Sequence, residues 1–87
     1  IDLSAKELRV DNIPVPLTKS EYLICEYLAS NKGQVFSKEQ IYEATFSLYG
    51  ESDSSTISTH IKNIRSKFEK TGVQPIVTVW GIGYRWE

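Results

Sequence analysis

The sequence predicts one α+β domain, with short strands near both ends of the chain and helices between them. Three observations predict this arrangement. Short apolar runs separated by turn residues occupy both ends of the chain. Two helix-capping boxes follow the first of these runs, and an apolar stripe at helical spacing lies further along. The length of 87 residues fits one domain with a modest core and leaves no room for a cleft between two lobes.

The N-terminal strands are predicted at residues 7–10 and 13–17, on either side of the turn pair Asp11–Asn12. Pro14 and Pro16 stand two positions apart, so their missing N–H groups fall on one edge, as in an edge strand. Residues 1–3 are a candidate earlier strand. Because the chain opens in a strand-like stretch without methionine, we expect a fragment of a longer protein.

The first two helices are each predicted from a capping box. Thr18 and Glu21 begin a helix that should run to about residue 31, where Gly33 favours its end. Ser37 and Gln40 begin a second helix, which should run to about residue 46, and residues 35–36 form a short strand between the two. The expected core positions are Leu23, Ile24, Tyr27 and Leu28 in the first helix, and Ile41, Ala44 and Thr45 or Phe46 in the second.

A loop at residues 47–54, rich in serine and acids, precedes a third helix that should reach about residue 70. Asp53, Ser54 or Ser55 could cap this helix. Ile57, Ile61, Ile64 and Phe68 repeat at spacings of four, three and four, which makes one narrow core stripe. A β-hairpin is then predicted from the runs 76–80 and 83–86 around Gly81.

With that stripe facing the core, the outward face of the third helix is polar and carries no acid. Arg65 and His60 lie on opposite flanks, with Lys67 beyond. Such a face is often simply solvated, but hydroxyls permit close approach to another surface and Asn63 can pair with adenine. The outward residues are Ser55, Thr56, Thr59, Lys62, Asn63, Ser66 and Lys70.

Charge is divided unevenly along the chain. Residues 1–53 hold five cations and nine acids, whereas residues 54–87 hold five cations and two acids, so net charges of −4 and +3 give the total of −1. An acidic half joined to a basic half suggests that one face meets a polyanion.

The amino-acid composition excludes several classes of protein. Hydrophobic residues make up 40% and charged residues 24%, which is typical of a folded globular domain. Cys25 is the single cysteine and is expected in the core, so no intrachain disulfide can form. One Cys and one His cannot build a structural zinc site. We expect no cofactor, no metal, no membrane contact and a cytoplasmic location.

Helix, short strand, helix, loop, long helix and hairpin together predict a winged helix-turn-helix. The chain resembles the C-terminal effector domain of OmpR/PhoB-type response regulators, the transcription factors of bacterial two-component systems. Four stretches carry the resemblance, in order: residues 16–22, 33–40, 55–68 and 78–85. It implies an N-terminal antiparallel sheet, three helices and a C-terminal β-hairpin wing, with no catalytic residues.

The resemblance also implies sequence-specific binding of duplex DNA. The third helix, about 54–70, would lie in the major groove and the wing, about 76–86, at the adjacent minor groove. Base-facing positions are Thr56, Ser58, Thr59 and Asn63; phosphate-facing positions are Ser55, His60, Lys62, Arg65, Ser66, Lys67, Thr78 and Tyr84; and wing positions are Trp80, Gly81 and Arg85. A loop that can meet RNA polymerase corresponds to Ser47, Tyr49, Glu51 and Asp53.

By the same resemblance, a receiver domain would precede the chain and a sensor histidine kinase would act on it. The isolated domain would be a monomer that pairs head to tail on direct repeats. Asn63 and Ser55 stand where relatives often have Arg, which predicts weak binding by one monomer. Trp80 stands where many relatives place a minor-groove Arg. It could lie against sugar and phosphate, but packing under the hairpin is favoured for an aromatic residue there.

Two other functions remain open. The winged helix could serve only protein contact, which the acidic first half and few arginines favour; steep salt dependence would argue for DNA instead. Ser58, Thr59 and His60 could belong to a small hydrolase, but neighbours on a helix point in different directions and no third group is placed to orient them.

Overall fold

The computed structural model describes residues 7–46 and 54–87. The candidate strand at 1–3 and the proposed polymerase-loop residues Ser47, Tyr49, Glu51 and Asp53 lie outside these ranges. No helix among the described residues is long and apolar enough to cross a membrane. The elements in order are β1 (Leu8–Val10), β2 (Ile13–Val15), α1 (Lys19–Ser30), β3 (Val35–Phe36), α2 (Lys38–Thr45), α3 (Thr56–Glu69), β4 (Ile76–Val79) and β5 (Gly83–Trp86).

The N-terminal hairpin is confirmed. β1 and β2 pair antiparallel, with Val10 opposite Ile13. The turn residues Asp11 and Asn12 both have positive φ, 51° and 68°, which a two-residue hairpin turn of this hand requires and which Asp and Asn tolerate. The strands bury Leu8, Val10 and Val15 and leave Ile13 exposed.

The second sheet has the strand order β3–β5–β4, so the short link between the two helices pairs with the C-terminal hairpin. Val35 lies opposite Arg85 and Phe36 opposite Tyr84. Gly83 is required where β5 passes β3, because a Cβ there would lie 1.9 Å from the carbonyl oxygen of Phe36. The close approach holds the turn end of the hairpin against the link between α1 and α2.

Both capping boxes are confirmed. The Thr18 backbone N–H donates to Glu21 Oε1 at 2.9 Å, and the Glu21 N–H donates to Thr18 Oγ1 at 3.2 Å. Ser37 and Gln40 make the same pair of bonds at 2.8 and 3.1 Å. The expected side-chain cap of α3 is wrong for Ser55, because its backbone is already helical and its side chain makes no capping hydrogen bond.

The predicted stripe of α3 is the centre of the core. Ile57, Ile61, Ile64 and Phe68 are each at most 1% exposed. Trp86 of β5 packs edge-on to Phe68, with ring centroids 6.3 Å apart. The core is therefore built around α3, and the opposite face of this helix is left to solvent.

Three predicted core positions need correction. In α2 the core residues are Ile41, Thr45 and Phe46, whereas Ala44 is exposed. Thr45 lies one turn beyond Ile41 and donates its hydroxyl to the Ile41 carbonyl at 2.6 Å, so its polar group is satisfied inside the core. In α1, Leu23 and Tyr27 are only partly buried and pack against the edge of the core, and the buried apolar positions beside Ile24 and Leu28 are Tyr22 and Cys25.

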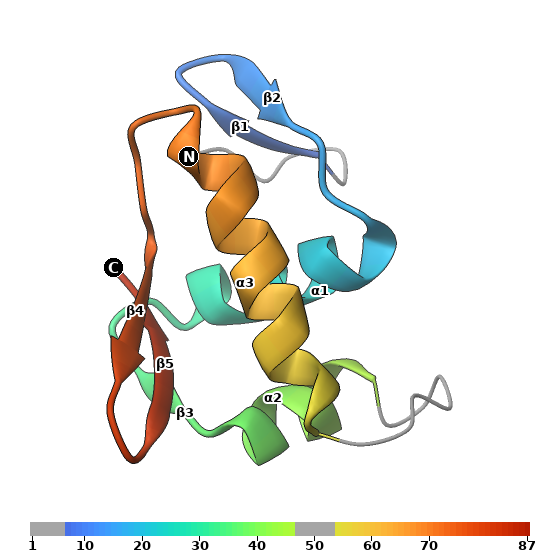
Figure 1. Cartoon of the computed structure of the whole chain (residues 1–87), viewed down its shortest axis with the longest axis vertical. Helices are drawn as coiled ribbons and strands as arrows, with labels where there is room; N and C mark the ends of the chain where they lie inside the picture. Colours follow the sequence, from blue (N-terminus) through green and yellow to red (C-terminus); the bar gives the residue numbers. More distant parts are fainter. Residues whose placement is uncertain (1–6, 47–53) are drawn as a thin grey trace.

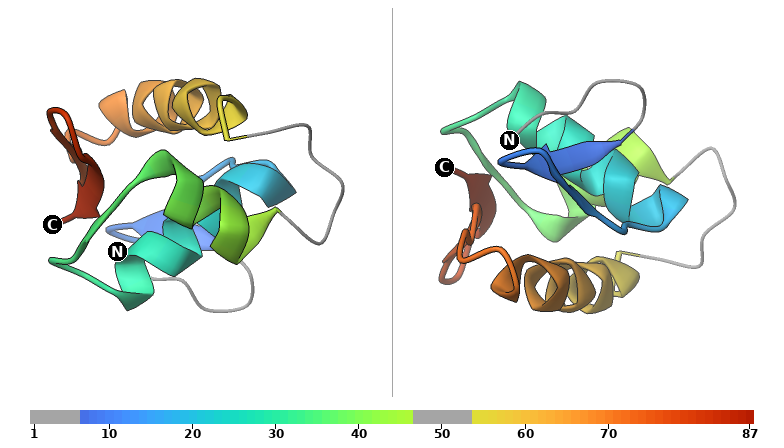
Figure 2. Two further views of the ribbon diagram at one scale, coloured as in Figure 1. Left: turned by 90° about the horizontal axis from the view of Figure 1, so that it is seen from below. Right: turned by 90° about the horizontal axis from the view of Figure 1, so that it is seen from above.

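The arrangement places α3 in a layer of its own. Figure 1 shows it crossing α1 and α2, with the β1–β2 hairpin near one end of the molecule and the β4–β5 hairpin toward the other. In both views of Figure 2 the loop that joins β4 and β5 reaches out to the level of α3. The wing and the outer face of α3 therefore lie on the same side of the molecule.

Candidate nucleic-acid interface

The outer face of α3 presents polar side chains to solvent. Ser58, Thr59, Lys62, Asn63 and Ser66 are exposed, as is Ser55 at the N-cap. Thr56 and His60 are partly buried. Glu69, in the last turn, is the acid of α3. Hydroxyls, an amide and a cation thus form a continuous face that carries no negative charge over most of its length.

Arg65 joins this helix to the wing. Its Nη2 donates to the carbonyl oxygen of Ile76 at 3.1 Å and to Oγ1 of Thr78 at 2.6 Å. The guanidinium carbon also lies 5.7 Å from the centroid of the Tyr84 ring, a cation–π distance. Three residues predicted to hold phosphates are therefore in one cluster, which sets the position of the hairpin relative to α3.

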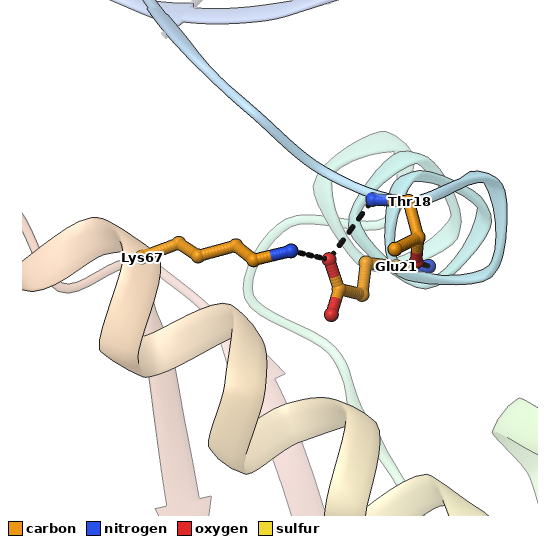
Figure 3. A network of polar contacts seen from close by, with 3 residues as sticks. All are labelled: Thr18, Glu21 and Lys67. Carbon is orange, nitrogen blue, oxygen red and sulfur yellow. Dashed lines mark hydrogen bonds and ion pairs between the residues drawn. The ribbon is translucent and has the colours of Figure 1, made fainter.

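Lys67 points toward α1 instead. Its Nζ donates to Oε1 of Glu21, the same oxygen that accepts the Thr18 backbone N–H (Figure 3). The Glu21 side chain is 4% exposed and that of Lys67 is 30% exposed. The ammonium group is thus committed to a buried carboxylate, and the phosphate contact of Lys67 stays a prediction.

The pKa of Glu21 reflects this setting. Burial alone would raise the pKa of the carboxyl group, but the hydrogen bonds and charge of Lys67 and the N–H of Thr18 outweigh burial and hold it below the ordinary value. Glu21 is therefore an anion inside the fold, held by two donors. The sequence predicted its capping role but not its pairing with α3; a Glu on an apolar helix face was the available signal.

The wing tip corrects one prediction. Trp80 is 89% exposed, so it does not pack under the hairpin. Only three residues lie between the last paired positions, Val79 and Gly83, and Gly81 has φ 80°. Trp80 thus lies beyond the final strand pair, with no neighbouring strand to cover it. Ile82, which the site prediction left out, is also 63% exposed.

A shallow hollow joins the wing to the helices. Its walls come from the first turn of α2, from Ser58 of α3, and from the hairpin residues Thr78, Trp80 and Tyr84. Lys38 and Glu39 of α2 contribute one charge of each sign. The wing tip and α3 therefore border one common depression.

His60, Arg85 and Cys25 each contact other residues of the domain or lie in its core. His60 lies against Phe46, with ring centroids 5.4 Å apart. Arg85 donates to Glu87 Oε1 at 3.1 Å. Cys25 is fully buried, and burial followed by the charge of Glu21 raises the pKa of its thiol to about 12, so it is not a reactive thiolate. Among the described residues, no cluster of His, Cys, Asp and Glu could hold a metal.

Comparison with known proteins identifies the family to which the chain belongs. The family described as "Transcriptional regulatory protein, C terminal" matches residues 12–86. The chain belongs to this family, the OmpR/PhoB-type winged-helix DNA-binding domains of response regulators. The predicted fold class is thereby confirmed.

Individual relatives of this chain are also transcriptional regulators and response regulators. The transcriptional regulatory protein SpaR of Bacillus subtilis is 49% identical over 83 residues, which is 95% of this chain and 38% of SpaR. The response regulator SaeR of Staphylococcus epidermidis is 39% identical over 85 residues, 95% of this chain and 37% of SaeR. The chain thus spans less than two fifths of the length of these relatives.

Solved structures match the whole fold. The DNA-binding domain of the response regulator AdeR, solved in complex with an intercistronic region, has a TM-score of 0.86 and 25% identity, covering 100% of this chain and 90% of that one. DrrB, an OmpR/PhoB homologue from Thermotoga maritima, has a TM-score of 0.81 and 28% identity, covering 99% of this chain and 40% of DrrB.

Proposed function

We propose that this domain binds duplex DNA sequence-specifically and controls transcription as the output domain of a response regulator. α3 lies in the major groove and the β4–β5 wing at the adjacent minor groove. The observation that carries the proposal is the acid-free outer face of α3 (Ser58 to Ser66), fixed beside the wing by Arg65. No catalytic role is assigned to any residue.

The chemistry of that face suits a major groove, which is wide enough to admit a helix. Ser58, Thr59 and Thr56 are short, so the helix backbone can come close to base edges. Asn63 offers a donor and an acceptor, the pattern that pairs with adenine. Lys62 supplies a positive charge for phosphate oxygens. His60, Ser55 and Ser66 extend the contact to the groove walls.

The relatives are more than twice as long as this chain, which supports proposing further domains and partners for the complete protein. We propose a receiver domain upstream, a sensor histidine kinase that acts on it, and a cytoplasmic location. We also propose that two copies bind direct repeats head to tail, with the isolated domain a monomer. A contact between RNA polymerase and residues 47–53 belongs to the same proposal.

The competing function is protein contact without DNA. The observation that favours it is the pairing of two cations of the basic half within the domain, Lys67 with Glu21 and Arg85 with Glu87. The two functions differ in salt dependence, because DNA binding releases counterions and weakens steeply with added salt. Protein contact predicts no binding to duplex at low salt.

Asn63→Ala tests base reading. Loss of a bidentate base contact should cost about 1–3 kcal/mol and relax preference at a single base pair. The measurement is affinity for a selected operator and for the set of its single-base-pair variants. If the variant weakens all sequences equally, Asn63 contacts the DNA backbone instead.

Lys62→Ala is the matching test of a phosphate contact. It should weaken binding evenly across sequences and reduce the slope of log affinity against log salt by about one. Lys32→Ala is the control, because Lys32 is exposed in the link between α1 and β3, which lies away from α3 (Figure 2). An unchanged slope for Lys62→Ala would remove it from the interface.

A further inference from the structure

The two cations on the flanks of α3 are both held by other parts of the domain. A rotation of about 100° per residue puts Arg65 and Lys67 on opposite sides of the outer face, each roughly a quarter turn from the core stripe. Arg65 donates to Thr78 and to the Ile76 carbonyl of the wing. Lys67 donates to Glu21 of α1 (Figure 3). These flanks are the positions from which a cation on a helix in the major groove reaches phosphate.

The carboxylate that holds Lys67 is buried. The Glu21 side chain is 4% exposed, and its Oε1 accepts a second hydrogen bond, from the Thr18 backbone N–H at 2.9 Å. Removing the ammonium group would leave this buried carboxylate without a counter-charge, which is strongly unfavourable. A DNA phosphate, by contrast, is solvated and already has condensed counterions, so it gains little from one more ammonium group. The balance therefore favours the pair of Lys67 with Glu21.

Three other cations border the proposed interface and differ from Lys67 in their surroundings. Lys62 and Lys70 of α3 are exposed, and Lys38 of α2 is exposed at the hollow beside the wing. The Lys67 side chain is only 30% exposed and its ammonium group has a carboxylate partner. Lys67 stands four positions after Asn63 and three before Lys70, so it neighbours both on the helix surface. Once released, its side chain would lie next to the outer face.

We propose, resting on the DNA binding proposed above, that Glu21 is a positioning residue that withholds the Lys67 ammonium group from DNA phosphate. The ion pair persists when α3 enters the groove, so the domain neutralises one phosphate fewer than its cations allow. Non-specific affinity comes almost entirely from neutralised phosphates, and one copy of the domain therefore binds a generic duplex weakly. Affinity then depends more on base contacts and on the second copy of the proposed pair.

Glu21→Gln releases Lys67 and tests the proposal. Glutamine keeps the capping box, as Gln40 does in α2, but has no charge with which to hold the ammonium group. We expect the slope of log affinity against log salt to steepen by about one, and binding of a generic duplex to tighten roughly five- to tenfold at about 0.1 M salt. The measurement is the fluorescence anisotropy of a labelled duplex titrated at several salt concentrations. Thermal unfolding verifies that each variant is folded.

Two further variants separate the release of Lys67 from a general gain of positive charge. Glu26→Gln removes the same charge from the same helix, but Glu26 accepts a hydrogen bond from Tyr22 of α1 itself, at 3.3 Å. Its salt slope should stay that of the parent. The double variant Glu21→Gln with Lys67→Met buries no charge. It should also bind with the slope of the parent, because the withheld ammonium group contributes no phosphate contact there.

Three results overturn the inference and leave the proposed function standing. The first is an unchanged slope for folded Glu21→Gln, and the second is an equal gain for Glu26→Gln. The third is a double variant whose slope is shallower than that of the parent by about one, because Lys67 would then already contact phosphate in the parent complex. If the parent itself does not bind duplex at low salt, the proposed function fails and this inference fails with it.

Discussion

Single residues illustrate how charge is used inside this domain. Lys67 is not a free cation of the basic half, because its ammonium group donates a hydrogen bond to the buried carboxylate of Glu21. Removing one partner of such a pair leaves a charge without compensation, which destabilises far more than loss of an exposed pair. Sequence alone could not find this pairing, since the two residues are 46 positions apart.

Lys67→Met should therefore destabilise the fold by about 1–3 kcal/mol at neutral pH and raise the pKa of Glu21. Glu21→Gln is the matched variant, because Gln keeps the capping box, as Gln40 does in α2. Denaturant unfolding of the parent and both variants between pH 3 and 7 measures the effect.

The sign of the pH dependence follows from the lowered pKa of Glu21. A carboxyl group with a folded-state pKa below its unfolded value stabilises fully above the unfolded value, which lies near 4.5, and loses this contribution as the pH falls through the folded value. The advantage of the parent over Glu21→Gln should be constant at pH 6–7 and shrink below about pH 4.5. An advantage that grows on acidification would contradict this assignment.

At the scale of elements, most of the fold was predictable because its signals are local. Capping boxes fix where α1 and α2 begin, and the turn pair Asp11–Asn12 fixes the first hairpin. The failures arose where tertiary position decides. The sequence predicts that Trp80 packs under the hairpin, but the last paired residue of β4 is Val79, so Trp80 lies in the turn and not on a strand.

The placement of the wing against α3 was likewise not predictable from local signals. The resemblance put Arg65, Thr78 and Tyr84 at phosphates, but no sequence pattern indicated that they bind one another. This cluster crosses from α3 to β4 and β5. The candidate interface is thus preorganised by contacts within the domain itself, which would reduce what must be ordered on the proposed binding of DNA.

Arg65→Met should release the wing from α3. Loss of the hydrogen bonds to Ile76 and Thr78 should lower amide protection in β4 and β5 and weaken DNA binding, while the α3 core stripe stays buried. Thr78→Val removes only the hydroxyl partner and should give a smaller effect of the same kind. Amide hydrogen exchange separates the two roles of Arg65. Weaker DNA binding with unchanged protection of the wing would make Arg65 a direct phosphate contact only.

Across the whole molecule, the net charge of −1 is the sum of an acidic half and a basic half that have different structural roles. The acidic first half supplies helices that support α3, and the basic second half supplies α3 and the wing on one side (Figure 2). The split between the halves pointed to a polyanion partner even though the overall charge did not. How many cations remain available depends on pairing, which only the structure reveals.

We propose that α3 and the wing together bind duplex DNA. An amide-resolved NMR titration with a generic duplex at low salt measures this binding residue by residue, since non-specific binding needs no known operator. We predict shifts in residues 55–67 and 78–84 that fade as salt is added, with β1 and β2 unaffected. If no residue of α3 shifts while the domain stays folded, this domain does not bind DNA through α3, which would contradict the proposed function.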